Sequence, residues 1–62
     1  MTETTKDILA RLSHLCSGQG EVAMAIALSS AVVTAEAIGF LDVANELEVA
    51  LEAYRPNRHH NS

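Results

Sequence analysis

The centre of the chain is a charge-free segment of fourteen residues, 22–35, between Glu21 and Glu36. On a helical wheel its apolar side chains cover almost the whole circumference, which leaves no face for water. A helix of this kind must be buried on several sides at once. A chain of 62 residues supplies few flanking elements that could bury it. We therefore expect another chain to cover part of this segment.

The chain is long enough for one domain. Its sequence predicts no disulfide or metal site that would stabilise a domain of this size. A domain of this length buries only about 60% of the surface that its unfolded chain exposes. Its single cysteine, Cys16, cannot form a disulfide within the chain, and no Cys/His set has zinc-finger spacing. Because oligomerisation is the remaining common source of stability, we expect a homodimer or a higher helical oligomer.

The charge is unevenly distributed. Residues 1–54 contain two basic and eight acidic side chains, whereas residues 55–62 contain two basic ones. An acidic body repels phosphate backbones and anionic lipids, so neither nucleic acid nor a membrane is an expected partner. The N-terminus lacks the pattern of a secretory signal, and the charge-free segment is shorter than the roughly 20 residues of a membrane span. We expect a soluble, cytoplasmic protein.

The spacing of apolar residues predicts three helices, at about 5–17, 21–38 and 41–55, in one domain, 1–55. Thr4, with Asp7 three residues later, predicts a capping-box start for the first helix. Glycines 18, 20 and 39 predict the helix ends, and Pro56 stops the last helix before a flexible polar tail, 56–62. The predicted apolar stripes are Ile8, Leu9, Leu12, Leu15 and Cys16 in the first helix, and Phe40, Val43, Leu47, Ala50 and Tyr54, widened by Ala44 and Leu51, in the third.

The middle segment also has a period of two, because larger apolar residues alternate with alanines from Val22 to Leu28. A helix is favoured over a strand because alanine is a strong helix former, the run is long for a strand, and no second strand is present to pair with it. We expect an all-α, up-down-up bundle of three helices with the middle helix most buried.

Read as a helix, the middle segment has two faces of large residues and one sector of small ones. The first face contains Val22, Ile26, Val33 and Ala37; the second contains Met24, Leu28, Val32 and Ala35; the small sector contains Ala23, Ala27, Ser30 and Thr34. Small residues at helical spacing allow a second helix to approach closely. The predicted surface for self-association or partner binding is Ala23, Met24, Ala27, Leu28, Ala31, Val32 and Ala35.

The third helix carries an acidic face that is a candidate docking surface for a basic partner. Its residues are Asp42, Glu46, Val49 and Glu52. Val49 is an apolar side chain among acids, as in many protein-binding patches, although a charged outer face that only solubilises the helix has the same pattern.

No catalytic, cofactor-binding or metal-binding residues are predicted. His14 has no second ligand one turn away, and His59 and His60 are neighbours whose side chains point apart in an extended segment. Cys16 on an apolar stripe behaves as a small hydrophobe, with an intermolecular disulfide as the alternative. Residues 18–20 lack the lysine and the preceding strand of a phosphate-binding loop.

These observations favour a non-enzymatic helical protein that acts by protein–protein interaction, as a regulatory, sequestering, antiactivator or adaptor protein. One alternative is a structural or assembly subunit of a larger complex. Another is a helix-turn-helix DNA-binding regulator, in which residues 22–35 would be the recognition helix. That segment contains no Arg, Lys, Asn or Gln to contact a base edge, so this alternative is the weaker one.

Overall fold

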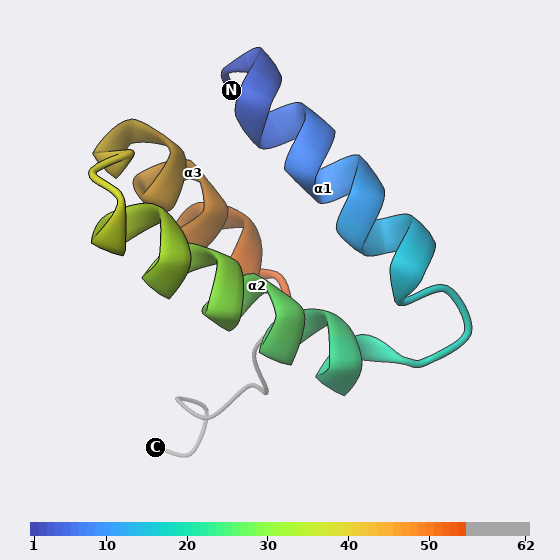
Figure 1. Cartoon of the computed structure of the whole chain (residues 1–62). Coiled ribbons are helices and arrows are strands. Elements are labelled where there is room, and N and C mark those ends of the chain that lie inside the picture. Colours follow the sequence, from blue (N-terminus) through green and yellow to red (C-terminus); the bar gives the residue numbers. More distant parts are fainter. Residues whose placement is uncertain (55–62) are drawn as a thin grey trace.

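The computed structural model describes residues 1–54, and three α-helices make up most of them (Figure 1). The helices are α1 (Glu3–Leu15), α2 (Glu21–Ala37) and α3 (Leu41–Glu52). No strand occurs within residues 1–54, so the prediction of a helical middle segment in an all-α domain is confirmed. The predictions for Pro56, for His59 and His60 and for a flexible tail lie outside the described residues.

Helix α1 begins two residues earlier than the sequence pattern predicted, because Thr2 is its N-cap. Thr2 has an extended backbone, with φ −70° and ψ 162°, and its hydroxyl oxygen accepts a 3.2 Å hydrogen bond from the backbone N–H of Thr5. This bond satisfies one of the donors that every helix start leaves without a partner. The expected cap at Thr4 or Thr5 is wrong, since both residues are already helical.

A tight connection joins α2 to α3. Gly39 adopts a left-handed conformation, with φ 88°. Its N–H donates to the Glu36 carbonyl at 3.1 Å, and the next N–H, that of Phe40, donates to the Ala35 carbonyl at 2.8 Å. This is the Schellman pair of hydrogen bonds that ends many helices at a glycine. Because Phe40 is also the N-cap of α3, the chain reverses within three residues and brings the two helices together.

The core is a seam between α2 and α3, which pack side by side far more extensively than either packs against α1. Leu28 and Leu47 are fully buried at its centre. All buried apolar residues come from these two helices: Met24, Leu28, Val32 and Ala35 from α2, and Val43, Ala44, Leu47 and Leu51 from α3. Their spacing of three or four residues forms one stripe on each helix.

Helix α1 lies at the periphery of this core. It is inclined away from the α2–α3 pair in Figure 1 and contributes only one buried residue, Thr5. Most of its predicted apolar stripe is half-buried against the core: Ile8, Leu9, Leu12 and Cys16. Leu15 is 73% exposed, so its assignment to the buried stripe is wrong. Leu12 and Cys16 on either side of it in the sequence pack against the core, so Leu15 is exposed because its side chain lies at the edge of the stripe.

Helix α2 is buried along one face only. The face of Met24, Leu28 and Val32 lies in the core, whereas Val22, Ile26 and Val33 on the other large-residue face are 71%, 63% and 64% exposed. The expectation that the middle helix has more apolar surface than its own chain can cover agrees with this distribution. This uncovered apolar surface of α2 is therefore a candidate interaction surface.

Candidate interaction surface

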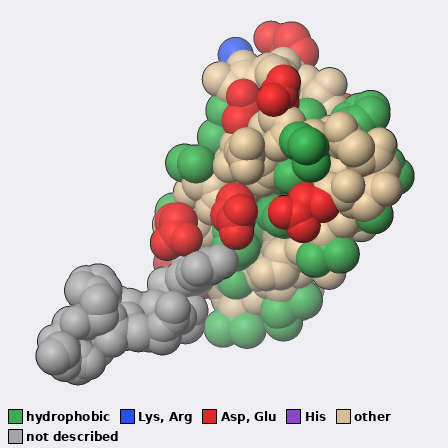
Figure 2. Space-filling view, turned by 90° about the vertical axis from the view of Figure 1, so that its left-hand side faces the viewer, with side chains coloured by type: hydrophobic (Ala, Val, Ile, Leu, Met, Phe, Trp, Pro, Cys, Tyr) green, Lys and Arg blue, Asp and Glu red, His purple; other side chains and the backbone are tan. Residues whose placement is uncertain are grey.

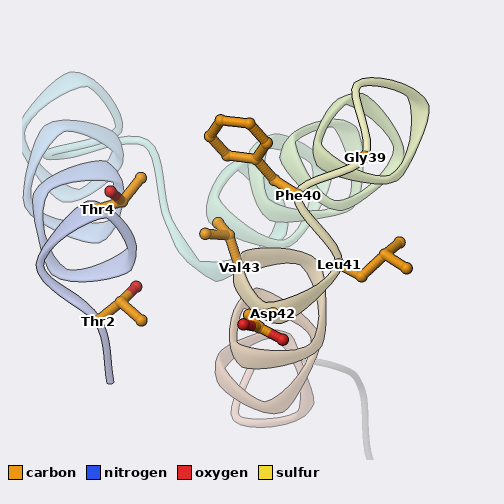
Figure 3. A pocket seen from close by; sticks show the side chains of 7 residues that line it. All are labelled: Thr2, Thr4, Gly39, Phe40, Leu41, Asp42 and Val43. Carbon is orange, nitrogen blue, oxygen red and sulfur yellow. The ribbon is translucent and has the colours of Figure 1, made fainter.

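The α2–α3 pair has two flanks with different environments. On one flank, Glu46 of α3 accepts hydrogen bonds from the start of α1. Since a helix turns by about 100° per residue, Glu48 lies about 200° further around α3, on the opposite flank. Figure 3 shows the same division at the start of α3, where Val43 points toward α1 and Leu41 points away from it. We name these sides the α1 flank and the open flank.

A shallow apolar groove runs along the open flank between α2 and the end of α3. Its lining includes Val22, Ala25, Ile26 and Ser29 from α2, with Leu51 from α3 and Tyr54 from the turn that follows α3. Leu51 forms the floor, because it belongs to the buried core, and Tyr54 is half-buried beside it. The groove is therefore the outer edge of the core seam, left without a covering helix. We call it the open groove.

The groove continues along α2 as a row of side chains at spacings of four, three, four and three residues. The row is Val22, Ile26, Ser29, Val33 and Glu36, and we name it the open seam. This spacing is the one that faces a partner helix in helix–helix packing. At about 1.5 Å per residue the open seam is about 21 Å long, which matches a partner helix of four turns.

The charge of the α2–α3 pair is entirely negative. The only basic residues in the described part of the chain are Lys6 and Arg11, which pair within α1 with Glu3 at 3.8 Å and with Asp7 at 3.2 Å. Helices α2 and α3 contain no Lys or Arg. Their acids are Glu21, Glu36, Asp42, Glu46, Glu48 and Glu52. In Figure 2, acidic side chains stand at separate points among apolar ones, and on this face basic colour is visible at the upper edge only.

On the α1 flank, three donors converge on one carboxylate oxygen. Glu46 Oε1 accepts from the Thr5 hydroxyl at 2.5 Å, from the Thr2 backbone N–H at 3.0 Å and from the Thr2 hydroxyl at 3.2 Å. The two hydroxyl oxygens are 2.9 Å apart. Each hydroxyl has one proton, so when Thr5 donates to the carboxylate, the Thr2 proton is shared between the carboxylate and the Thr5 oxygen. We call this group the threonine–glutamate clasp.

The clasp favours the charged form of Glu46. The hydrogen bond from the Thr5 hydroxyl and that from the Thr2 backbone lower the pKa of Glu46, against a smaller opposing effect of desolvation. The carboxylate also lies at the start of α1, where the helix dipole favours a negative charge. The clasp ties the first turn of α1 to the middle of α3 and explains why a threonine is buried there.

A second exposed apolar group lies at the α2–α3 connection. Ile38, Phe40 and Leu41 are each more than half exposed. A hollow beside them is lined by Thr2 and Thr4 of α1 and by residues 39–43 (Figure 3). The Phe40 ring points into the gap between α1 and α3, whereas Leu41 points to the open flank. This end of the bundle is apolar, but it lacks the length and regular spacing of the open seam.

The predicted self-association residues are divided between the core and its edge. Met24, Leu28, Val32 and Ala35 are buried against α3, so within this fold they do not reach the surface. Ala23, Ala27 and Ala31 are half-buried. Self-association itself stays a prediction, and the apolar surface of α2 that is free for it is the open seam.

The predicted acidic face of α3 is not one continuous surface. Glu46 is half-buried in the clasp, whereas Asp42 and Glu52 are exposed and Val49 is 67% exposed. Glu48, which was not among the predicted site residues, lies on the open flank. Among residues 1–54, neither Glu36 nor Glu48 makes an ion pair.

The described residues contain no group of side chains that could hold a metal ion. No cluster of three His, Cys, Asp or Glu side chains occurs there. His14 is exposed on α1 in a shallow depression with Asp7 and Arg11, and Cys16 is a half-buried free thiol.

The open seam could have been identified from the sequence by one signal. Of the two large-residue faces of α2, the buried one contains only apolar residues, whereas the row through Val22, Ile26 and Val33 also includes Ser29 and Glu36. A face that contains a charged residue is the one more often left at the surface. Sequence reasoning identified both faces and assigned the partner-binding role to the one that α3 covers.

Comparison of the chain with models of protein families, with curated proteins and with solved structures gave no match. Of the three helices in residues 1–54, none combines the length and the apolar character that crossing a bilayer requires.

Proposed function

We propose that this protein is a non-enzymatic binding protein that regulates or sequesters another protein through the open flank of its α2–α3 pair. The observation that carries the proposal is the open seam, where Val22, Ile26 and Val33 remain more than 60% exposed along one row. An ordered apolar row of this length beside a groove is typical of a surface that receives a helix. An antiactivator or adaptor uses this kind of surface.

The experiment is affinity capture of the full chain from cells that express it, with Ile26→Glu and Val49→Glu as a matched pair. Both positions are exposed Val or Ile residues on helices, but only Ile26 belongs to the open seam. A bound protein that is lost with Ile26→Glu and kept with Val49→Glu supports the proposal. The proposal is rejected if both variants retain every bound protein.

Self-association is the second candidate, and the uncovered face of α2 favours it. In this version the helices follow the up-down-up path and two copies pair through their open seams. Sedimentation equilibrium of the wild type and of Ile26→Glu tests it. A dimer that dissociates in the variant supports self-association, and a monomeric wild type at micromolar concentration rejects it.

The two remaining alternatives have less support. A subunit that folds only inside a larger complex requires an unfolded isolated chain, so a helical circular dichroism spectrum of the purified protein would exclude it. A helix-turn-helix regulator requires that α2 contact DNA, yet α2 contains no Arg, Lys, Asn or Gln. Salt-dependent binding to duplex DNA is the result that would revive this alternative.

A further inference from the structure

Each flank of the α2–α3 pair offers a position where a helix can pack, and α1 occupies one of these two positions. On the α1 flank, α1 covers the edge of the core with Ile8, Leu9 and Leu12, and its polar residues point outward. The open groove is the corresponding edge on the other side, with Leu51 as its floor. Within the described residues, the α2–α3 seam therefore has one edge covered by a helix of its own chain and one edge that no helix covers.

The charges around the open flank indicate what kind of helix can pack in the open groove. Glu36 ends the open seam, Glu48 lies on the same flank of α3, and Glu21 precedes the first groove residue. The α2–α3 pair supplies no basic side chain to neutralise them. A partner that covers the groove therefore removes water from these carboxylates, which favours a partner that brings positive charge.

A second copy of the chain does not meet this requirement. Its own α2–α3 pair is equally acidic, so pairing two open flanks would place carboxylates near carboxylates without a counter-charge. Its α1 has two acids and two bases that already pair with one another. The chain's segment 55–62 carries Arg55 and Arg58 but no large apolar side chain to fill the groove.

We propose that the open groove and the open seam bind a basic amphipathic helix of another protein. This inference rests on the proposed function and names the chemistry of the partner. The partner helix has a stripe of apolar residues at i, i+3 or i+4, and i+7, over about four turns, and Lys or Arg on both sides of that stripe. The stripe packs on Val22, Ile26 and Leu51, and the basic residues pair with Glu36 and Glu48.

The test uses two synthetic helical peptides of about 18 residues, each long enough to span the open seam. Both have Leu at the stripe positions; one has Lys at the flanking positions and the other has Glu. Fluorescence anisotropy measures the binding of each peptide to the full chain. We expect the Lys peptide to bind and the Glu peptide to bind at least about tenfold more weakly, with the difference reduced at high salt.

Matched variants locate the binding site. Ile26→Ser should weaken binding of the Lys peptide about tenfold, because it removes an apolar contact residue from the open groove. Val49→Ser, at an equally exposed Val on the predicted acidic face of α3 and outside the groove, should leave binding unchanged, which distinguishes the groove from that face as the binding site. Glu48→Gln should weaken binding by about threefold, whereas Asp42→Asn, on a different side of α3, should have no effect. Circular dichroism confirms that each variant stays helical.

Three results would overturn the inference. Equal binding of the two peptides would exclude a preference for a basic partner. An equal loss of Lys-peptide affinity in Ile26→Ser and Val49→Ser would exclude the groove as the binding site. A dimer that depends on Ile26, with no peptide binding, would assign the groove to a second copy. Photo-crosslinking from position 26 in cells separates this inference from the proposed function. A crosslinked protein without a basic helix rejects only the inference, whereas no crosslinked protein rejects both.

Discussion

The two flanks of the α2–α3 pair differ in how much of their apolar surface the described part of the chain covers. On the α1 flank, a helix covers the edge of the core and the clasp at Glu46 fixes it there. On the open flank, Val22, Ile26 and Val33 extend the apolar surface and each remains more than 60% exposed. Among the described residues, the third helix of the bundle, α1, covers one flank of the α2–α3 pair. We propose that the first flank serves stability and the second serves binding.

Leu28→Ala should have the largest effect on stability. Leu28 is fully buried at the centre of the seam, and removing a buried Leu side chain costs about 2 to 5 kcal/mol of folding free energy. For a chain of this size, such a loss is comparable to the whole stability, so we expect the variant to be largely unfolded. Urea titration followed by circular dichroism measures it. A variant with wild-type stability would contradict the assignment of this face to the core.

Thr2→Ala should have a smaller effect, on the α1 flank. It removes the N-cap of α1 and one hydroxyl of the clasp, and loss of a Thr N-cap costs about 1 kcal/mol. Thermal unfolding of the variant compared with Thr4→Ala, which is exposed and already helical, isolates the cap. Equal melting temperatures for the two variants would show that Thr2 does not cap the helix.

The clasp also predicts a pH dependence. Because the folded protein lowers the pKa of Glu46, the clasp stabilises the fold above the unfolded pKa of about 4.3, and this stabilisation is lost as the pH falls through the lower folded pKa. A double-mutant cycle with Thr5→Val and Glu46→Gln should therefore show coupling at pH 7 that decreases toward pH 3. A coupling energy that does not change with pH would rule out a charged clasp.

Ile26→Ser should have the smallest effect on stability, although it lies on the same helix as Leu28. Its side chain is 63% exposed, and substitutions at such positions change the folding free energy by less than about 0.5 kcal/mol. Chemical denaturation of the variant beside Leu28→Ala compares the two faces of α2 directly. Strong destabilisation by Ile26→Ser would mean that the open flank is part of the core of the fold.

The periodicity of apolar residues was sufficient to predict three helices, because helix formation depends on local spacing. It predicted the apolar stripe of α3 in part, since Val43 and Leu47 are buried whereas Phe40 is 53% exposed. The choice between the two large-residue faces of α2 was not predictable by spacing alone, since it depends on which face meets Leu47 and Leu51. The clasp was also missed, because Thr2 and Glu46 are 44 residues apart and their contact is set by the tertiary fold. The exposure of Leu15 was missed likewise, because which edge of the α1 stripe meets the core is set by the tertiary packing of Leu12 and Cys16.

The most direct test of the difference between the flanks is the rate of thiol labelling at one position on each face of α2. Ile26→Cys and Val32→Cys are made in the Cys16→Ser background and labelled at several protein concentrations. We predict rapid labelling of Cys at position 26 and strong protection at position 32. Equal protection of the two positions in dilute protein would contradict an open flank on this chain.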